Sequence, residues 1–389
     1  MTDSLLPRLV AGIDAVLPEA ASLRRAIHAD PHLGGDEMDT RDSITQAIDW
    51  LDWLPVAETG AYARFGPAGP AVGLRAELDA LPITEATGVE WASQRRGIMH
   101  ACGHDVHMAA LWAVVTAARD LDLPVAMVPL LQPREEENPP GATDVVASGF
   151  LDDVEVAAMV GVHVQPQVEK GVVSTGAGAV NAAFDSFEIT VRGRGGHGAY
   201  PHTALDPITV LAAIVGGLGE LPQRIVNPIH PSVVSVGTFK AGTAANVIAE
   251  TATCTGSIRT FHEADRVALH EAIARLAEGT ALARGATATA TFVRGGPALV
   301  NDPDLSRRAD HLLGGLAIPV AHVPFRSCGS DDFSEYGHVV PSLMSFVGVG
   351  SEGGVGLHHA QFLPGRGALR LCAVALAANY VAAAAQIRS

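Results

Sequence analysis

The chain has 389 residues, of which 48% are hydrophobic and 17% charged, and its formal net charge is −16. This length favours two domains, and the apolar content excludes an intrinsically disordered chain. The excess of acidic residues argues against nucleic acid as a partner, because binding to phosphates requires a basic face.

The first part of the sequence alternates helices with apolar strands. In chain order the predicted elements are helical patterns at 5–17 and 22–31, a strand at 71–78, a helix at 107–121, a strand at 124–133, a short helix at 142–151 and a strand at 156–164. Near-continuous apolar strands separated by helices are typical of a mostly parallel sheet covered by helices on both faces. The fold class is therefore α/β for this part of the chain.

The pattern changes after about residue 182. The next elements are a half-exposed strand at 187–193, a helix opened by Asp206 and Pro207, strands at 232–242 and 250–261, a helix at 266–283 and a strand at 286–293. The order β-α-β-β-α-β over 184–294 predicts a ferredoxin-like α+β domain.

The apolar pattern then resumes with a strand at 342–350 and a closing helix at 368–385. We therefore predict a discontinuous catalytic domain, residues 1–182 and 296–389, with residues 183–295 inserted as a second domain.

Residues that can bind metals follow the apolar strands of the first domain. The stretch HACGHDVH, residues 100–107, precedes the helix at 107–121. The residues at the strand ends are Glu77 and Asp79, Glu135 and Glu136, His163, and His358 and His359. In open α/β sheets, sites gather outside the carboxyl ends of the strands, so this placement indicates a metal centre.

The residue types narrow the choice of metal. A cysteine, histidines and carboxylates suit zinc, manganese or cobalt better than calcium or magnesium. Such a set can hold two ions about 3.5–4 Å apart, with a spare carboxylate as general base. Taken singly, each motif also has a structural interpretation: a helix entry for HACGHDVH, a solvated patch for the acidic run 135–137, and a core residue for His163.

These motifs resemble the amidohydrolase branch of the two-metal aminoacylase and carboxypeptidase family, which includes hippurate hydrolases and N-acyl-amino-acid amidohydrolases. The resemblance runs from LRRAIHADPHL at 23–33 through HACGHD, LQPREE, GVHV, GGHGAYPH and DDFSEY to GLHHAQF. It implies a catalytic α/β domain with a ferredoxin-like lid, a homodimer formed through the lid, and hydrolysis of N-acyl amino acids or related amides.

The resemblance also implies roles for individual residues. It gives the metal ligands for two divalent ions as Cys102, His104, Glu136, His163 and His358. Glu135 would be the catalytic base, and His197 the lid histidine that reaches the oxyanion. Asn246 and Arg259 would bind the substrate carboxylate, a task that suits the planar guanidinium of arginine. His100, His107, Asp79 and Asp105 are expected to support these groups.

Some positions depart from the family pattern. Glu77 replaces the usual aspartate, three glutamates stand at 135–137 where two are usual, and Pro139 and Pro140 replace a glycine-rich run. With three glutamates in a row, the catalytic base could be Glu135 or the residue next to it. The prolines stiffen the loop and can reshape the pocket, so the pattern does not identify the substrate. VIAE replaces VIPD after Asn246, which itself is retained.

Rival functions remain to be separated by experiment. One is a dipeptidase or carboxypeptidase of the same family, and another is a non-catalytic homologue that binds a ligand. Gly193, Gly195 and Gly198 match a dinucleotide-binding pattern, but the following helix begins only near Asp206, so we reject that site. Scattered cysteines, no membrane-length apolar run and no basic leader predict a cytoplasmic protein without a membrane partner.

Overall fold

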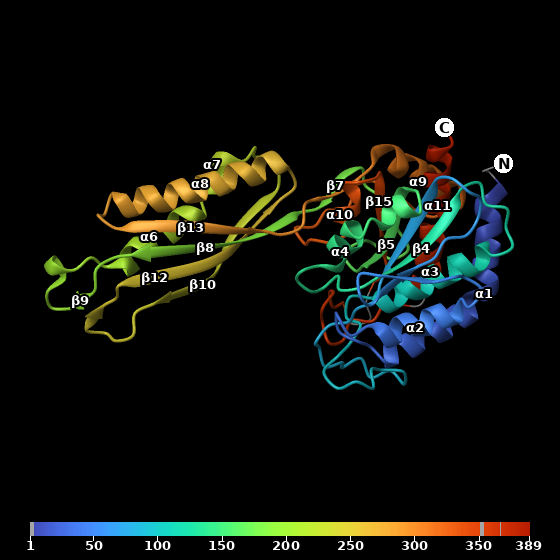
Figure 1. Cartoon of the computed structure of the whole chain (residues 1–389), viewed down its shortest axis with the longest axis horizontal. Coiled ribbons are helices and arrows are strands. Elements are labelled where there is room, and N and C mark those ends of the chain that lie inside the picture. The colour runs from blue at the N-terminus through green and yellow to red at the C-terminus, as the bar shows by residue number, and fades with distance from the viewer. Residues whose placement is uncertain (1–3, 351–353, 366) are drawn as a thin grey trace. The chain divides into compact units, whose positions relative to one another are not determined.

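The computed structural model describes residues 4–350, 354–365 and 367–389. The chain divides into two compact units, coloured along the chain in Figure 1. Unit 1 contains residues up to Gly178, then Val300–Phe325 and Asp332–Ser389, and unit 2 contains Ala179–Leu299 and Arg326–Asp331. Residues 326–331, which the sequence placed in the first domain, thus group with unit 2, because Ala182 N donates to the carbonyls of Ser327 and Gly329.

Unit 1 is built on a seven-stranded, mostly parallel sheet. Its strands, in spatial order, are β1 (Leu54–Val56), β2 (Gly60–Tyr62), β4 (Ala126–Gln132), β3 (Ala71–Glu77), β5 (Val156–Gln165), β15 (Ser342–Gly348) and β6 (Val173–Ser174). The four central strands are parallel to one another, and the short outer strands pair antiparallel. Every residue of β3, β4 and β15 is buried, which explains why their sequences are mostly apolar. The predicted α/β class is confirmed.

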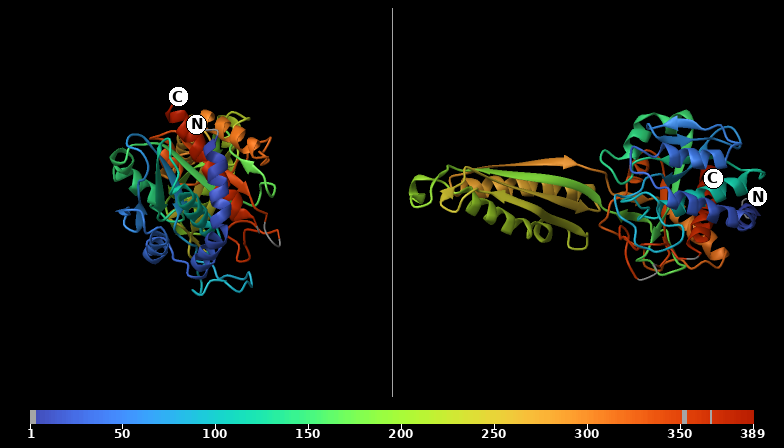
Figure 2. Two further views of the ribbon diagram at one scale, coloured as in Figure 1. Left: turned by 90° about the vertical axis from the view of Figure 1, so that its right-hand side faces the viewer. Right: turned by 90° about the horizontal axis from the view of Figure 1, so that it is seen from below.

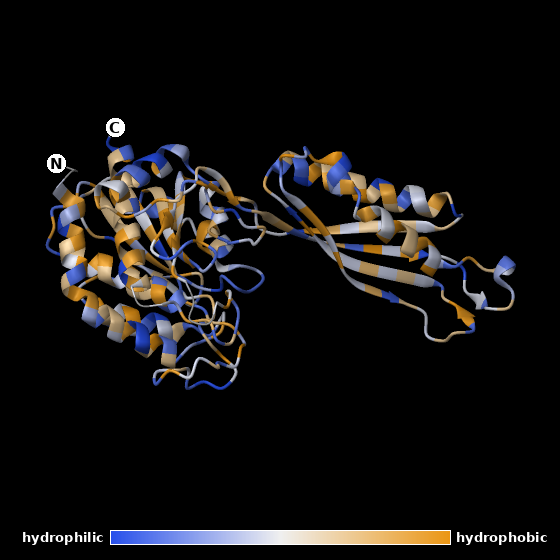
Figure 3. Ribbon diagram, turned by 180° about the vertical axis from the view of Figure 1, so that it is seen from behind, coloured by the Kyte–Doolittle hydropathy of each residue, from blue (hydrophilic) through white to orange (hydrophobic). Residues whose placement is uncertain are grey.

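Helices cover both faces of this sheet (Figures 1 and 2). The helices of unit 1 are α1 (Leu5–Ala29), α2 (Met38–Ala47), α3 (His104–Ala118), α4 (Gly141–Ala147), α5 (Phe150–Asp153), α9 (Pro303–Gly315), α10 (Ser334–Gly337) and α11 (Ala368–Ile387). Of these, α1, α3, α9 and α11 pack together around one apolar core with the sheet. Figure 3 shows the same core as orange segments along the strands and helices.

Two helices differ from the sequence expectation. The patterns at 5–17 and 22–31 form the single helix α1, which continues through Pro18. Its buried residues, such as Leu9 and Ile13, face the core and outweigh the backbone hydrogen bond that a proline removes. Helix α11 is long and apolar enough to cross a membrane, but 83% of its apolar window is buried within the protein, as in the core helix of a globular domain.

Unit 2 is a four-stranded antiparallel sheet with helices on one face. The strands, in spatial order, are β10 (Ser232–Ala241), β12 (Thr251–Thr260), β8 (Ala183–Arg192) and β13 (Thr287–Arg294). In chain order this is 2-3-1-4, the arrangement of a split βαβ fold, as the sequence predicted. The helices are α6 (Pro207–Leu218), α7 (Leu221–Ile225) and α8 (Glu263–Leu282).

The sequence signals of unit 2 correspond to its local structure. Phe187, Ile189 and Val191 of β8 are buried against the helices, while the residues between them are half-buried or exposed. Asp206 caps α6 by accepting a hydrogen bond from Ile208 N at 2.9 Å. A two-stranded ribbon of β9 (Gly196–His197) and β11 (Val247–Ile248) completes the unit. Two further short strands, β7 (Gly178–Asn181) and β14 (Leu299–Asn301), lie where the chain passes from one unit to the other.

Candidate metal centre

The metal-binding residue types of unit 1 lie at the carboxyl edge of its parallel strands. Strand β3 ends at Glu77, β4 ends three residues before Glu135, and His163 lies near the end of β5. The loop after β15 carries His358. Because neighbouring parallel strands end at the same edge, residues as far apart in sequence as Glu77 and His358 are brought together there.

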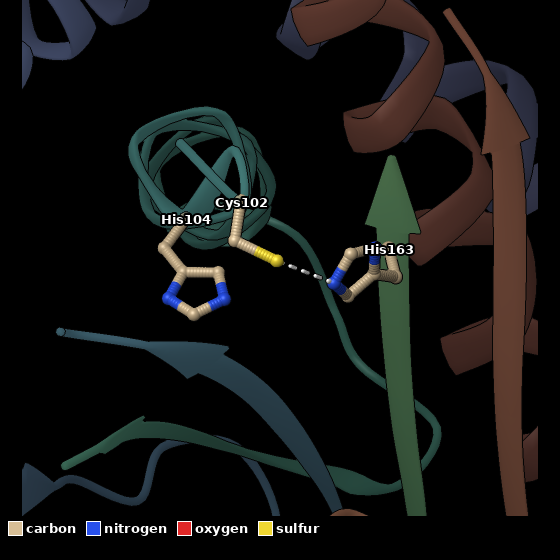
Figure 4. A group of neighbouring side chains, drawn as sticks. All are labelled: Cys102, His104 and His163. Atoms are coloured by element: carbon tan, nitrogen blue, oxygen red, sulfur yellow. Dashed lines mark hydrogen bonds between the residues drawn. The ribbon is translucent and has the colours of Figure 1, made fainter. Parts of the chain in front are cut away.

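A tight turn before α3 positions Cys102 and His104. Helix α3 begins at His104, three residues earlier than the sequence predicted, and Gly103 precedes it with φ +91°. A Cβ atom at Gly103 would lie 2.4 Å from Val164, so only glycine fits there. Figure 4 shows the result: Cys102 and His104 project from the start of the helix toward His163 on β5.

Three donor atoms of this group converge. The Sγ atom of Cys102 lies 3.4 Å from Nε2 of His163, and ligand atoms of Cys102, His104 and His163 all lie within 4.8 Å of one another. Nδ1 of His163 donates to the carbonyl of Val164 at 2.7 Å, which leaves Nε2 with a lone pair facing the cysteine. That tautomer is the one that a metal ligand requires.

Asp79 holds two of these donors in place. Nδ1 of His104 donates to the backbone carbonyl of Asp79 at 2.8 Å, so Nε2 is again the free nitrogen. A carboxylate oxygen of the same aspartate accepts from the backbone N–H of Glu136 at 2.8 Å. Asp79 is fully buried, and it thus fixes both a histidine ring and the loop that carries the glutamates.

The three consecutive glutamates point to different places. A carboxylate oxygen of Glu136 lies 3.0 Å from Nε2 of His358, and both residues group with Cys102 within 4.8 Å. Glu135 lies one step away, with Oε2 3.9 Å from Nε2 of His104. Glu137 is exposed and its side chain packs against Gly34. Glu136 therefore lies with Cys102 and His358, whereas Glu135 lies beside His104.

His358 is held in a strained backbone conformation. Its φ is +62°, in the left-handed region that non-glycine residues rarely occupy, and its N–H donates to the carbonyl of Ala101 at 2.9 Å. Such strain costs on the order of 1–3 kcal/mol and concentrates at functional sites. The following His359 is exposed and accepts a backbone hydrogen bond from Gln361, which ties it to its own loop.

The electrostatics of the cluster favour a bound cation. Burial, with the charges of Glu136 and Glu135, raises the pKa of the Cys102 thiol well above its usual range. Burial lowers the pKa of His104, but the carboxylates of Glu77 and Asp79 outweigh it and raise that pKa to about 10. The protein thus crowds acidic groups around donors that a divalent ion would deprotonate.

The hydrogen-bond pattern agrees with this charge balance. Within the described ranges of the chain, Nε2 of His104 is buried and has no hydrogen-bond partner. A buried ring nitrogen without a partner costs free energy unless a ligand occupies the space before it. The residues therefore fit a divalent metal of the zinc, manganese or cobalt type.

Buried charged residues next to the cluster form a network of ion pairs and hydrogen bonds. Glu77 forms an ion pair with Arg75 and accepts from Nδ1 of His107 at 2.9 Å, and Nε2 of His107 accepts from Val164 N. Arg75 also pairs with Asp332 at 2.7 Å. His107 and Glu77 therefore support the site without belonging to the group that surrounds Cys102.

Sequence reasoning missed Glu37, which positions the glutamate loop. This residue is fully buried, and its carboxylate accepts from the hydroxyl of Thr59 at 2.7 Å and from the backbone N–H of Arg134 at 2.9 Å. Arg134 has φ +52°, so Glu37 stabilises an unfavourable turn directly before Glu135. Nothing near Glu37 in the sequence signals this role, because its partners are 22 and 97 residues away.

The remaining predicted site residues lie in unit 2. His197 and Asn246 are exposed neighbours, since His197 pairs with Val247 and Gly198 N donates to the carbonyl of Asn246. Arg259 is half-buried, stacks over Phe184 at 4.8 Å and donates to the carbonyl of Cys328 at 2.7 Å.

These three residues occupy opposite ends of the unit 2 sheet. Arg259 pairs with Phe184 near one end of β12, and Thr251 marks the other end, beside the ribbon of His197. Eight residues of extended strand separate the two positions, which is about 26 Å. His197 and Asn246 of one chain therefore cannot contact the same small substrate as Arg259 of that chain.

Comparisons with known proteins agree with this picture. The sequence model described as peptidase family M20/M25/M40 matches residues 73–379. The chain is 34% identical to the N-acetylcysteine deacetylase of Bacillus subtilis, over 88% of this chain and 90% of that protein. It is 31% identical to thermostable carboxypeptidase 2 of Saccharolobus solfataricus, over 85% and 86% of the two chains.

A solved structure shares the fold as well as the sequence. It is a Bacillus subtilis protein described as a dinuclear metal binding peptidase, with a TM-score of 0.84 and 30% sequence identity. The match covers 95% of this chain and 98% of the other. The similarity therefore extends over both units and includes the strand ends that carry the candidate ligands.

Proposed function

Because the chain belongs to peptidase family M20/M25/M40 and is a hydrolase of amide bonds, we propose that its substrates are N-acyl amino acids or related linear amides. The products would be a carboxylic acid and a free amino acid. The observation that carries this proposal is a pair of ligand groups that share the buried Cys102, one with His104 and His163 and the other with Glu136 and His358, with Glu135 beside His104.

We propose that this group holds two divalent ions of the manganese, zinc or cobalt type. The deprotonated thiol, the three imidazoles and the Glu136 carboxylate would provide five ligands for these ions. When bound, such ions lower the pKa of a water molecule and polarise the scissile carbonyl.

Glu135 is the proposed general base. Its carboxylate is nearly buried, at 10% exposure, and lies beside the ligand group without being counted among the ligands. It would accept the proton of the attacking water and donate it to the departing amine, so the same carboxylate acts first as base and then as acid.

His197 is the proposed donor to the oxyanion. Its Nδ1 accepts a hydrogen bond from the backbone N–H of Ala199 at 3.1 Å, so a neutral His197 carries its proton on Nε2. An exposed Nε2–H is a suitable donor to the negative oxygen that develops in amide hydrolysis, and such stabilisation is commonly a large part of catalysis.

The two ends of the unit 2 sheet are best explained by a homodimer. If Arg259 binds the substrate carboxylate, His197 and Asn246 of the same chain lie about 26 Å away along β12. In a dimer with two-fold symmetry, one active site would receive Arg259 from one chain and His197 with Asn246 from the other. This assignment accounts for all three residues without a change of sheet geometry.

An activity panel tests the proposed reaction. Metal-stripped protein would be restored with Mn²⁺ or Zn²⁺ and offered N-acetyl, N-benzoyl and longer N-acyl amino acids together with dipeptides. Mass spectrometry would identify the products. We expect metal-dependent cleavage of the N-acyl compounds, and the absence of any cleavage by fully loaded protein would contradict the proposal.

A second candidate function is peptide hydrolysis. The 31% identity to thermostable carboxypeptidase 2 over most of both chains favours it as the alternative. Cleavage of dipeptides with a free amino group, in preference to their N-acyl counterparts, would assign the protein to this activity.

A further inference from the structure

A second cluster of metal-binding side chains lies in unit 2, outside the candidate metal centre. It consists of His230, His262 and Asp265, whose ligand atoms all lie within 4.8 Å of one another. Nδ1 of His230 lies 2.7 Å from a carboxylate oxygen of Asp265, and the two imidazole rings are 4.0 Å apart between centroids. None of the three has a role in the proposed hydrolysis.

The backbone places each of the three residues firmly. His230 lies between Pro228 and Pro231, and its N–H donates to the carbonyl of Asn227 at 2.7 Å. The side chain of Asn227 also accepts from the backbone N–H of Ile229, which closes the turn. The loop is therefore stiff before any ligand binds.

The other two residues begin helix α8. His262 is the residue directly before the helix and follows the buried Phe261, while Asp265 lies in the first helical turn. The cluster thus joins two segments, the loop before β10 and the start of α8, that are more than 30 residues apart in sequence.

The arginines near Asp265 pair with other carboxylates and do not neutralise it. The neighbouring Arg266 turns away and donates from Nε to Asp185 at 2.7 Å, and Arg294 pairs with Glu263. Across the described residues, His230 is the ion-pair partner of Asp265. The two imidazoles and the carboxylate thus place three donors of the types that transition metals prefer within 4.8 Å of one another.

We propose that His230, His262 and Asp265 bind a transition-metal dication such as Zn²⁺, Ni²⁺ or Cu²⁺. Two imidazoles and one carboxylate suit these ions and are a poor set for Ca²⁺ or Mg²⁺. Metal–ligand bonds of about 2.0–2.2 Å require only a small approach of the three ligand atoms, and His262 is exposed and free to turn. Water completes the coordination on the solvent side.

The bound ion would stabilise the end of the unit 2 sheet where Arg259 lies. Residue Val233, three positions after His230, pairs directly with Arg259, and Thr260 lies two residues before His262. An ion at the cluster would therefore link the flanks of β10 and β12 and restrict opening of this end of unit 2.

Zinc binding to the full-length protein tests the proposal. Chelator-treated wild type, His262→Ala and His322→Ala would be dialysed against micromolar Zn²⁺, and bound zinc measured by mass spectrometry of the metal. His322 is an exposed histidine outside the cluster and serves as the control. We expect His262→Ala to bind about one zinc ion fewer per chain than the other two proteins, with an unchanged circular dichroism spectrum. Equal zinc content in all three would overturn the proposal.

Chemical modification of the unaltered protein gives a second test that does not depend on a variant folding. Diethyl pyrocarbonate reacts with free imidazole nitrogens, and peptide mass spectrometry reports each histidine separately. Zn²⁺ should slow modification of His230 and His262 at least about tenfold, while His322 reacts at the same rate. Equal rates at His262 with and without Zn²⁺ would contradict a site at this cluster.

Discussion

The two units hold their candidate functional residues in opposite ways. In unit 1 the side chains of Cys102, His104 and His163 are buried, and each ring has a second group that fixes it. In unit 2, His197 and Asn246 are exposed and are held mainly through the backbone of the β9–β11 ribbon. The candidate residues of unit 1 are thus fixed through their side chains, whereas those of unit 2 are exposed and fixed through the backbone.

The two units also differ in whether their candidate residues come together within a single chain. The ligand group of unit 1 is assembled from four strand ends of a single chain. The predicted substrate-binding residues of unit 2 lie at two ends of one sheet, and under the proposed dimer they would act together only across two chains. A chain altered in unit 1 and a chain altered in unit 2 should therefore complement each other in a mixed dimer.

The largest effect is expected from Glu135→Gln. The substitution keeps the size of the side chain and removes the proton acceptor, so kcat should fall by roughly 10³-fold or more, at the upper part of the range for general acid–base catalysis. Metal content, measured on the same sample, should match wild type. A variant that retains a tenth of the wild-type kcat would show that Glu135 is not the base.

His197→Ala should lower kcat by about 10²–10³-fold, the usual cost of losing an oxyanion donor. Since His197 lies in unit 2, metal binding by the unit 1 centre should be unchanged. Steady-state kinetics with an N-acyl amino acid would measure the effect, and Tyr200→Phe, at a neighbouring exposed ring, is a suitable control.

Mixed dimers test whether Glu135 and His197 of one active site come from different chains. If each site takes its base from one chain and His197 from the other, a hybrid of Glu135→Gln and His197→Ala chains contains one intact site. After unfolding and refolding of an equal mixture, about a quarter of the wild-type activity should return. No recovery would show that both residues act from the same chain or that the chains do not exchange.

The strand pattern of unit 1 predicted where its metal-binding side chains gather, and the family resemblance selected the proposed ligands among them. Parallel strands end at a common edge, so Glu136 and His163 could be placed together from the strand pattern alone. The fold of unit 2 was predicted from the β-α-β-β-α-β order of its elements, two of which were marked by the alternation in β8 and the capping pair before α6. In both cases a local pattern determines a local structure.

The sequence did not reveal contacts that depend on the closed fold. Glu37 supports the Arg134 turn from 97 residues away, and Asp332 pairs with Arg75 across 257 residues. The distance between Arg259 and His197 was hidden for the same reason, because it depends on strand direction and not on residue type. Such contacts follow from tertiary packing and have no periodic signal along the chain.

The buried charges of unit 1 should make its stability depend on pH. Burial lowers the pKa of His28, but the charge of Asp105 outweighs it, with hydrogen bonds from Asp105 and Glu85, and raises it to about 9 from 6.5. Because the folded pKa is raised, the stabilisation is complete below about pH 6.5 and is lost as the pH rises toward about 9. The contribution is on the order of 3 kcal/mol.

Urea unfolding at pH 6.5 and pH 9 would measure this dependence in wild type and in His28→Gln. The variant cannot be protonated at this position, so the part of the difference in the free energy of unfolding that His28 contributes should disappear, while the part from His104, whose pKa is also raised, remains in metal-free protein. His202→Gln in unit 2, an exposed histidine, should retain the wild-type dependence. A similar loss in both variants would mean that the pH dependence does not originate at His28.

The smallest of these effects is expected from Asp79→Asn. The substitution keeps the backbone carbonyl that orients His104 but replaces the carboxylate that accepts from Glu136 N and lies 3.4 Å from the His104 ring. Loss of such a supporting charge weakens metal binding by about 10–100-fold. Competition with a chromogenic chelator would measure the change in Kd for Zn²⁺, with Asp14→Asn, at an exposed ion pair with Arg370, as the control. If Asp79→Asn bound Zn²⁺ as tightly as wild type, the rigidity of the unit 1 centre would have to come from its ligands alone, and the contrast with unit 2 would be weaker than the hydrogen bonds indicate.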